Sequence, residues 1–275
     1  MPPIITSPTI HATDWFCPNS KTALFYRYWI PPRPQLIVIL VHGAGQNSSR
    51  FLELATRLMG SGIGSYAFDL RGFGHSCGPR GHITSFFEYL DDLHDFVQLI
   101  RKIHPESSLF LLGHSMGGVI GLRYGQEFDS PIHGLLLSSP ALRLKISLPK
   151  VGQSLIRSAS HYLPSLHIRP TRWSPLLRRI RALRPLTTHG LVDPWDTDRF
   201  SARWFSELLH HGQPALIHAN RMTCPVLSVY PHDDPVIDPG AVRDLHSRLT
   251  TPDHTQILLH HAVHNWVFLV LSQIR

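Results

Sequence analysis

The sequence predicts an α/β protein with a mostly parallel central sheet, helices on both faces and an inserted helical cap. Short apolar runs alternate with helix-like segments, which is typical of a parallel sheet covered by helices. One apolar run ends in a glycine-flanked turn and continues as a helix, and more than eighty residues without a strand-like run later interrupt the alternation. With 275 residues and a hydrophobic content of 43%, the chain can bury one large core.

The first part of the chain predicts a hairpin, two further strands and a helix. Residues 14–30 alternate around the turn signal Pro18-Asn19-Ser20 and predict an antiparallel hairpin. The continuous apolar run 35–41 predicts a strand that is buried on both faces. Helical spacing over 50–59 and a short apolar run at 65–70 predict the next helix and strand.

A predicted strand, sharp turn and helix present a candidate reactive side chain. An amphipathic helix is predicted over 86–103, and the apolar run 109–112 then ends in the G-x-S-x-G motif of residues 113–117, with a helix after it. A sharp strand-to-helix turn holds Ser115 beside a helix N-terminus, whose free N–H groups can stabilise an oxyanion. Glycine-rich turns also occur without chemistry, so the motif alone leaves a purely structural interpretation open. Residues 134–139 predict the next buried strand.

The interruption divides the chain into a core and an insertion. A structureless loop longer than eighty residues is improbable in a compact domain, so the interruption predicts a largely helical subdomain. We expect residues 1–140 and 223–275 to form the two parts of the core and residues 141–222 to form the cap. Apolar spacing predicts cap helices at 151–163 and 200–209.

The last strands supply an acid and a base. The run 225–230 leads into Pro231-His232-Asp233-Asp234. After a predicted helix at 239–249, the run 255–260 leads into His260-His261-Ala262-Val263-His264, and a final helix is predicted from Asn265. With Ser115, the chain therefore presents Ser, Asp and His in the order expected of the α/β-hydrolase fold. A serine hydroxyl is a poor nucleophile until a base takes its proton, and the base needs a carboxylate to fix its tautomer.

Three segments carry a family resemblance. HGAGQNSSRF is similar to an HGxGEHSxRY box, DLRGFGHSCGPRGHI to a D-x-R-G-x-G-x-S-x-G-x-R-G-H segment, and GHSMGG to the usual elbow of one family. Asp193-Pro194 and VYPHDDPVID also resemble its segments before and around the acid. The chain thus resembles the monoacylglycerol lipase and lysophospholipase branch of the α/β-hydrolases, a serine aminopeptidase-like family, over nearly its whole length.

The resemblance assigns roles to the candidate residues. It implies that Ser115 is the nucleophile, Asp234 the acid and His264 the base, and that the backbone N–H groups of Ala44 and Met116 form the oxyanion hole. The implied function is cleavage of an acyl ester of a single-chain lipid, a monoacylglycerol or lysophospholipid, through an acyl-enzyme. Two alternatives stay open: an amidase or peptidase on the same fold, and a catalytically silent membrane-binding protein. No cofactor and no metal are implied.

Some residues depart from the family pattern. Gln46-Asn47 replaces Glu-His, which we expect to retune the acyl pocket. Pro231 replaces a glycine before the acid, so Asp233 stays a second candidate for the acid beside Asp234. Asp238 is a third acidic residue nearby, and we expect it to cap the next helix. The last helix is short, so its apolar residues Trp266, Val267 and Leu269 are expected to be exposed.

The loop after the second core strand carries two charged residues. Asp69 and Arg71 lie in the DLRGFGHS segment, close to the predicted elbow. We expect them to form a structural ion pair beneath the elbow and assign them no catalytic role.

The net charge of +7 comes from one segment. Residues 141–190 hold ten of the 26 basic residues and no acidic residue, so the other 16 basic residues stand against all 19 acidic ones. Interleaved apolar residues favour a surface that rests on anionic lipid, although an ordinary solvated face is equally compatible. Nucleic acid is disfavoured because Trp173 stands almost alone and no aromatic platform exists.

Composition narrows the compartment and the chemistry further. Three scattered cysteines form neither a disulfide framework nor a metal pattern, and the twenty histidines show no ligand spacing. The first residues lack a basic start and an apolar core, and no run reaches the roughly 18 apolar residues of a spanning helix. We therefore expect a cytoplasmic protein, in solution or at a membrane surface, and predict no oligomeric state.

Overall fold

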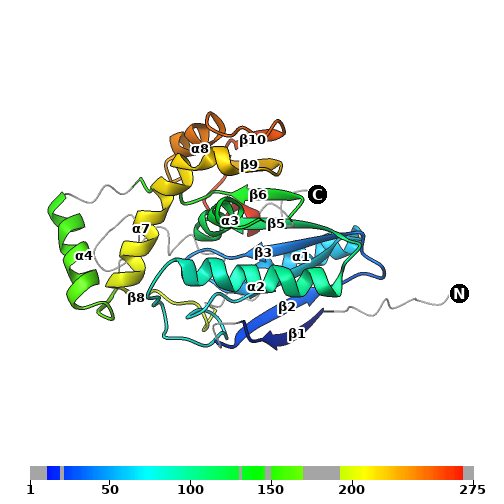
Figure 1. Ribbon diagram of the computed structural model, residues 1–275, viewed down its shortest axis with the longest axis horizontal. Coiled ribbons are helices and arrows are strands. Elements are labelled where there is room, and N and C mark those ends of the chain that lie inside the picture. The colour runs from blue at the N-terminus through cyan, green and yellow to red at the C-terminus, as the bar shows by residue number, and fades with distance from the viewer. Residues whose placement is uncertain (1–10, 19–21, 130–131, 146–149, 170–192, 269–275) are drawn as a thin grey trace, which may run out of the picture.

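A single mixed sheet organises the part of the chain that the computed structural model describes, residues 11–18, 22–129, 132–145, 150–169 and 193–268 (Figure 1). The strand order is β1-β2-β4-β3-β5-β6-β9-β10. In this sheet β2 pairs antiparallel with both β1 and β4, and the pairs from β4 through β3, β5, β6 and β9 to β10 are parallel, which confirms the predicted fold class. The strands are β1 (His11–Phe16), β2 (Leu24–Trp29), β3 (Leu36–Val41), β4 (Gly64–Phe68), β5 (Ser108–His114), β6 (Gly134–Ser138), β9 (Val226–Pro231) and β10 (His254–Leu259).

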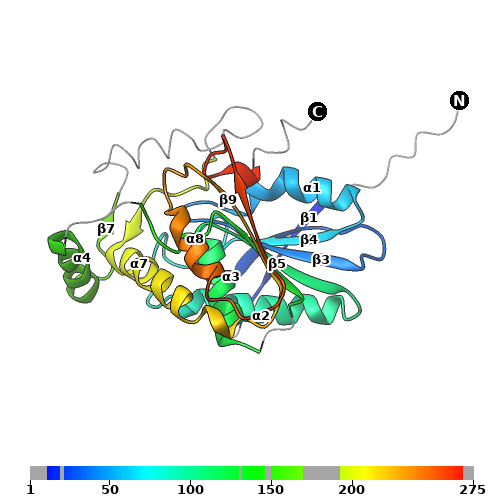
Figure 2. The same ribbon diagram turned by 90° about the horizontal axis from the view of Figure 1, so that it is seen from above.

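Helices cover both faces of the sheet. Figure 2 shows α1 (Leu52–Gly60) on one face and α2 (Phe87–Ile103), α3 (Met116–Glu127) and α8 (Pro239–His246) on the other. Strand β3 explains how both faces become apolar: Ile37 and Ile39 pack into the larger core beneath α2 and α3, whereas Val38 and Leu40 pack into a smaller core with α1. Since successive strand residues point to opposite faces, a continuous apolar run supplies both cores.

The segment between β6 and β9 stands beside the sheet. It contains α4 (Lys150–Tyr162) and α7 (Ala202–Ile217); α7 packs against α3, and α4 packs against α7 at the edge of the molecule (Figure 1). The indole N–H of Trp204 on α7 donates to the Tyr89 hydroxyl on α2 at 3.0 Å, which anchors α7 to the core.

The same segment also contains strand structure, contrary to the expectation that it has none. Strands β7 (His167–Ile168) and β8 (Phe200–Ser201) pair antiparallel. Each has only two residues, too few for a period-2 pattern to be visible in the sequence.

The end of the described chain is more buried than expected. A 3-10 turn, η3 (Trp266–Phe268), stands where a helix was expected to begin, and Val267 and Phe268 are buried in the smaller core. The Phe268 ring lies edge-on to that of Phe51, with centroids 5.3 Å apart. The expectation of an exposed apolar face at Val267 is therefore wrong, and Leu269 lies outside the described residues.

The expected Asp69–Arg71 ion pair is also wrong. The Arg71 guanidinium donates to both carboxylate oxygens of Asp92 on α2, at 2.6 and 2.5 Å, and to Glu88 at 2.9 Å. Asp69 instead accepts the backbone N–H groups of Ser48 at 2.6 Å and His75 at 2.7 Å. Arg71 thus ties the loop after β4 to α2, while Asp69 ties that loop to the 3-10 helix η1 (Ser48–Phe51), which precedes α1.

Candidate active site

Ser115 stands on a strained turn between β5 and α3. Its backbone φ of 52° and ψ of −114° are rare for a residue with a side chain, and such strain typically costs ~1–3 kcal/mol. The flanking glycines make the turn possible: a Cβ on Gly117 would lie 2.2 Å from the carbonyl oxygen of Val41, and a Cβ on Gly113 would lie 2.2 Å from that of Gly117. The Ser115 hydroxyl is therefore held at the carboxyl end of β5, beside the N-terminus of α3.

Three strand ends bring Ser115, Asp234 and His264 together. The Ser115 hydroxyl lies 3.0 Å from His264 Nε2, and His264 Nδ1 lies 2.8 Å from Asp234 Oδ2. Asp234 is fully buried and follows β9, and His264 is buried and follows β10. The geometry therefore joins a hydroxyl, an imidazole and a carboxylate in one hydrogen-bonded line.

Electrostatics assigns the protons in this line. Burial opposes ionisation of Asp234, but the hydrogen bond from His264 and those from the N–H groups of Val236 at 2.8 Å and Ile237 at 3.1 Å outweigh it and lower its pKa. The carboxylate is thus ionised at neutral pH and can only accept hydrogen bonds. His264 Nδ1–H donates to it, so Nε2 is free to accept the Ser115 hydroxyl proton.

The competing acids lie elsewhere. The Asp233 side chain is exposed and contacts the neighbouring His232 ring at 3.0 Å. Asp238 caps α8 by accepting the Gly240 N–H at 2.8 Å, as the sequence predicts, and pairs with Arg143. Pro231 ends β9 in regular register with β10, so it does not shift the following loop by one residue.

A tight turn after β3 faces the serine. The Gln46 N–H donates a hydrogen bond to the Gly43 carbonyl at 3.3 Å, which closes the turn. Within the turn, Gly45 has a positive φ of 74°. Gly43 packs so closely against Ser115 that an added Cβ would lie 3.2 Å from the serine Cβ. Buried His42 accepts the Leu70 N–H on Nε2 at 3.0 Å and contacts the Gly43 carbonyl through Nδ1 at 2.8 Å. We call residues 43–47 the oxyanion loop, after the role that the family resemblance implies for the Ala44 N–H.

Gln46 and Asn47, which replace Glu-His of the family pattern, both bond to other protein groups. Gln46 is buried and bridges the Gly43 N–H, at 3.0 Å, to the side chain of Asn265, at 3.4 Å. Asn47 donates to Asp193 at 3.0 Å and to Asp196 at 3.2 Å. The contact of Asn265 with Gln46 was not predicted from the sequence. The one available signal was that Asn265 directly follows the predicted base, His264.

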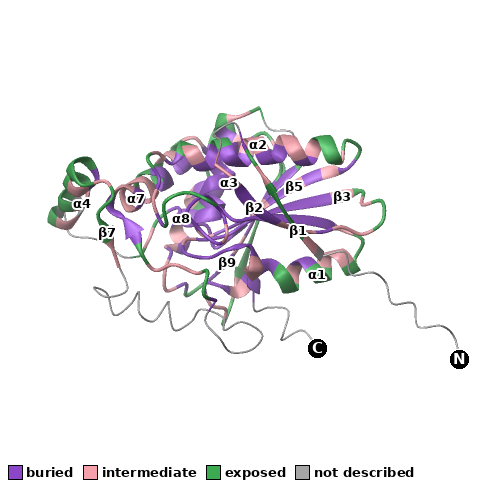
Figure 3. Cartoon of the chain, turned by 90° about the horizontal axis from the view of Figure 1, so that it is seen from below, coloured by how far each residue is buried: buried purple, intermediate pink, exposed green. Residues whose placement is uncertain are grey.

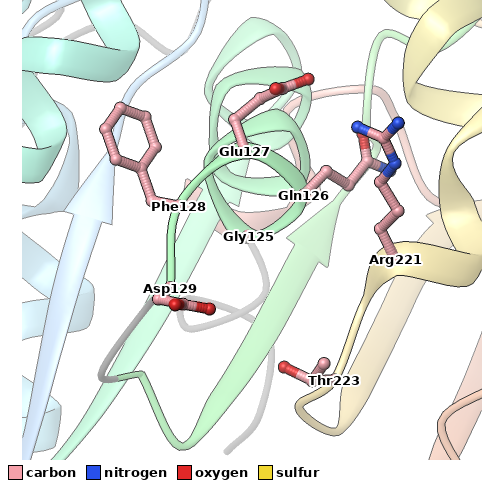
Figure 4. Close-up of a pocket in the computed structure, with 7 residues that line it drawn as sticks. All are labelled: Gly125, Gln126, Glu127, Phe128, Asp129, Arg221 and Thr223. Atoms are coloured by element: carbon pink, nitrogen blue, oxygen red, sulfur yellow. The ribbon is translucent and has the colours of Figure 1, made fainter.

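Other possible sites in the described residues lack this chemistry. No group of three or more His, Cys, Asp or Glu side chains there could hold a metal ion. A pocket of about 540 Å³ lies at the C-terminal end of α3, beside Arg221 and Thr223 (Figure 4). Since α3 starts beside Ser115 and extends ~18 Å over its 12 residues, this pocket lies at the opposite edge of the sheet.

The helices of the described residues are also relevant to membrane contact. None of them has both the length and the apolarity that crossing a bilayer requires.

Comparisons with known proteins show which proteins the chain is similar to. The sequence model of a family described as serine aminopeptidase, S33, matches residues 32–268. The chain is 29% identical to phospholipase YtpA of Bacillus subtilis over 76% of this chain and 80% of that protein. It is 27% identical to the monoacylglycerol lipase of Mycolicibacterium smegmatis over 88% and 87%. The crystal structure of Paleococcus ferrophilus monoacylglycerol lipase superposes with a TM-score of 0.74 at 28% identity, covering 88% of this chain and 90% of that one.

Proposed function

We propose, from the premise that the chain belongs to the serine aminopeptidase S33 family of α/β-hydrolases, that it cleaves the acyl ester of a single-chain lipid through an acyl-enzyme. Its relatives make it a carboxylic ester hydrolase of the monoglyceride lipase and phospholipase type. The observation that carries the mechanism is the hydrogen-bonded line from Ser115 through His264 to Asp234. The proposed substrate is a monoacylglycerol or a lysophospholipid.

Acylation begins at the serine. Ser115 Oγ attacks the ester carbonyl carbon while its proton moves to His264 Nε2, and Asp234 stabilises the imidazolium that forms. The carbonyl electron pair moves onto oxygen, and in our proposal the N–H groups of Ala44 and Met116 stabilise this oxyanion. As the intermediate collapses, the bond to the alcohol breaks and His264 returns the proton to the leaving alkoxide. The acyl group stays on Ser115.

Deacylation repeats these steps with water. His264 Nε2 takes a proton from a water molecule whose oxygen attacks the acyl-enzyme carbonyl, and the same N–H groups stabilise the second oxyanion. The ester bond to Ser115 then breaks, and Ser115 Oγ recovers its proton from His264. The products are a fatty acid and the free alcohol, glycerol or a glycerophosphodiester.

Substrate turnover tests this proposal directly. We expect kcat/KM for monoacylglycerol or lysophosphatidylcholine to exceed that for aminoacyl amides by at least about a hundredfold, or ~2.7 kcal/mol in activation free energy. The reason is that an amide expels a poorer leaving group than an ester does. A panel of p-nitrophenyl esters of increasing chain length would identify the acyl preference. Comparable or faster amide turnover would favour the amidase alternative and contradict the ester assignment.

Helix α4 supports contact with a lipid surface. Three large side chains are mostly exposed there: Val151 at 71%, Leu155 at 65% and Tyr162 at 78%. At ~100° per residue they lie within about 40° of one another, on one face of the helix. Figure 3 shows α4 at the edge of the molecule, with exposed and half-buried residues along the helix. We propose that residues 141–222 form a cap, between core parts 1–140 and 223–275, and that this face of α4 dips into the lipid interface.

Some basic residues of the proposed cap are paired with acidic residues, which reduces the charge that could attract anionic lipid. Arg143 pairs with Asp238 at 2.8 Å and Asp244 at 2.7 Å, and Arg169 lies 3.8 Å from Asp198. Acidic residues outside the acid-free stretch 141–190 thus neutralise part of its charge. The cluster Arg178, Arg179 and Arg181 lies outside the described residues. Its attraction to anionic lipid stays a prediction, as does the cytoplasmic location.

Liposome binding tests the cap. We expect a Val151→Ser and Leu155→Ser double variant to bind phosphatidylcholine and phosphatidylserine vesicles at least about fivefold more weakly, because fully burying each side chain contributes ~1.5–3 kcal/mol. Co-sedimentation measures the binding, and turnover of a short soluble ester should not change. The matched control is Leu52→Ser with Ile103→Ser, which replaces exposed apolar residues of α1 and α2. Equal binding by both double variants would contradict the docking face.

Charge reversal tests the basic cluster separately. With Arg178, Arg179 and Arg181 replaced by Glu, we expect vesicle binding to lose its increase with phosphatidylserine content and its decrease with salt. If vesicle binding of the unaltered protein does not depend on lipid charge, the electrostatic part of the proposal is wrong. The apolar part of the proposal does not depend on that result.

A further inference from the structure

A buried hydrogen-bond network joins the oxyanion loop to the residues next to the proposed base and nucleophile. Its first member is Gln46, whose side chain is 6% exposed. The Gln46 amide oxygen accepts the Gly43 N–H at 3.0 Å, which closes the oxyanion loop next to Ala44. The Gln46 amide nitrogen donates to Asn265 Oδ1 at 3.4 Å, across a sequence separation of 219 residues.

The network continues to the base and the nucleophile. Asn265 is 4% exposed and directly follows His264, and its Oδ1 also lies 3.0 Å from Nε2 of His114, the residue before Ser115. Burial lowers the pKa of His114 to about 3, so its ring is neutral at physiological pH. An amide oxygen only accepts hydrogen bonds, so the His114 proton lies on Nε2, and Nδ1 accepts the Ser138 hydroxyl at 3.1 Å.

Each member of this network is adjacent to a reacting group. Gln46 closes the turn that presents Ala44, Asn265 follows the base His264, and His114 precedes the nucleophile Ser115. A displacement of 1 Å in such groups can cost about a hundredfold in rate. We propose that Gln46 and Asn265 are positioning residues that hold the oxyanion loop, the base and the nucleophile in mutual register. This inference rests on the proposed function of Ser115 and His264.

A leucine variant separates positioning from simple stability. Gln46→Leu keeps the size of the side chain but loses both hydrogen bonds, so we expect kcat for a soluble ester to fall about thirtyfold with KM within about twofold. A long-chain trifluoromethyl ketone adds Ser115 Oγ to its carbonyl carbon and places an oxyanion in the same hole. We expect its Ki to rise by the same factor, while the Ki of the corresponding methyl ketone stays unchanged.

The chain offers a matched control in Gln126. This side chain is 7% exposed and donates to the Ala215 carbonyl at 2.8 Å, near the end of α3 that lies away from Ser115. Gln126→Leu should lower the Tm about as much as Gln46→Leu does, but it should leave kcat and the ratio of the two Ki values unchanged. A Gln46→Leu protein whose kcat and Ki ratio match those of the control would overturn the positioning role.

A second variant keeps the proposal testable if Gln46→Leu does not fold. In Gln46→Glu, the carboxylate still accepts the Gly43 N–H but cannot donate to Asn265. Asn265 must then turn over and donate from Nδ2 to Glu and to His114 Nε2, which forces the His114 proton onto Nδ1, toward Ser138. We expect kcat within about threefold of the unaltered protein, and a switch of the His114 tautomer in ¹⁵N NMR spectra. An unchanged tautomer would overturn the network.

The outcomes also distinguish this inference from the proposed function. If the unaltered protein hydrolyses esters and a fluorophosphonate labels Ser115, the function stands, and only the Gln46 variants decide the positioning role. If the unaltered protein does neither, the proposed function fails, and the positioning role fails with it.

Discussion

Ser115→Ala is expected to reduce ester turnover by about 10⁴-fold or more while the protein stays folded. The hydroxyl is the one nucleophile within hydrogen-bond distance of His264 Nε2 in the described site, at 3.0 Å. An alanine Cβ needs no new space at this turn, and the strained backbone of residue 115 is kept because glycines flank it. Initial rates on a soluble p-nitrophenyl ester, with circular dichroism to check folding, measure the effect. A fluorophosphonate probe should label the unaltered protein at Ser115.

A second serine–histidine contact supplies the control. Ser228 on β9 is fully buried, and its hydroxyl lies 2.8 Å from His246 Nε2, but His246 Nδ1 faces His254 at 3.2 Å where a carboxylate would be needed. Burial lowers the pKa of His246 to about 4. Ser228→Ala should therefore keep turnover and labelling within about twofold. Activity that survives Ser115→Ala, with labelling at another serine, would sink the assignment of the nucleophile.

The elements around Ser115 were predictable because their signals are local. The apolar run of β3 is visible in six consecutive residues, and the elbow is visible as two glycines around one serine. The order of Ser115, Asp234 and His264 along the chain was also readable, since parallel strands present their carboxyl ends at one edge of a sheet. Local pattern and chain order thus predicted the fold and a serine, an acid and a base at three strand ends. The family resemblance then selected Asp234 and His264 among the neighbouring acids and histidines.

The parts that escaped prediction depend on tertiary contacts. The partner of Arg71 is Asp92, one turn along α2 from Glu88, and its identity depends on how that helix rotates against the loop. The Gln46–Asn265 hydrogen bond joins segments 219 residues apart, and no local pattern marks either residue. The contact of Phe268 with Phe51 likewise joins the last described residues to a distant segment of the chain, and no local pattern marks it.

Asp234→Asn is expected to reduce kcat by up to about 10⁴-fold, the loss seen when the equivalent acid of a well-studied serine protease is changed in this way. The reason lies in the surroundings of the carboxylate. Its Oδ1 accepts the N–H groups of Val236 and Ile237, so an asparagine must keep its oxygen there and turn its NH₂ group toward His264 Nδ1. Nδ1 must then accept, the ring proton moves to Nε2, and Nε2 can no longer take the proton of Ser115.

The neighbouring acid is the matched control for this change. Asp233→Asn makes the same substitution one residue away, at a side chain that is 92% exposed and contacts His232 instead of His264. We expect kcat and KM on a soluble ester at pH 7 to 8 to stay within about twofold, because exposed pairs contribute little. Fluorophosphonate labelling rates should follow the same order, since labelling also needs Nε2 to take the serine proton. Equal losses in the two variants, or a larger loss in Asp233→Asn, would show that Asp234 is not the acid that orients His264.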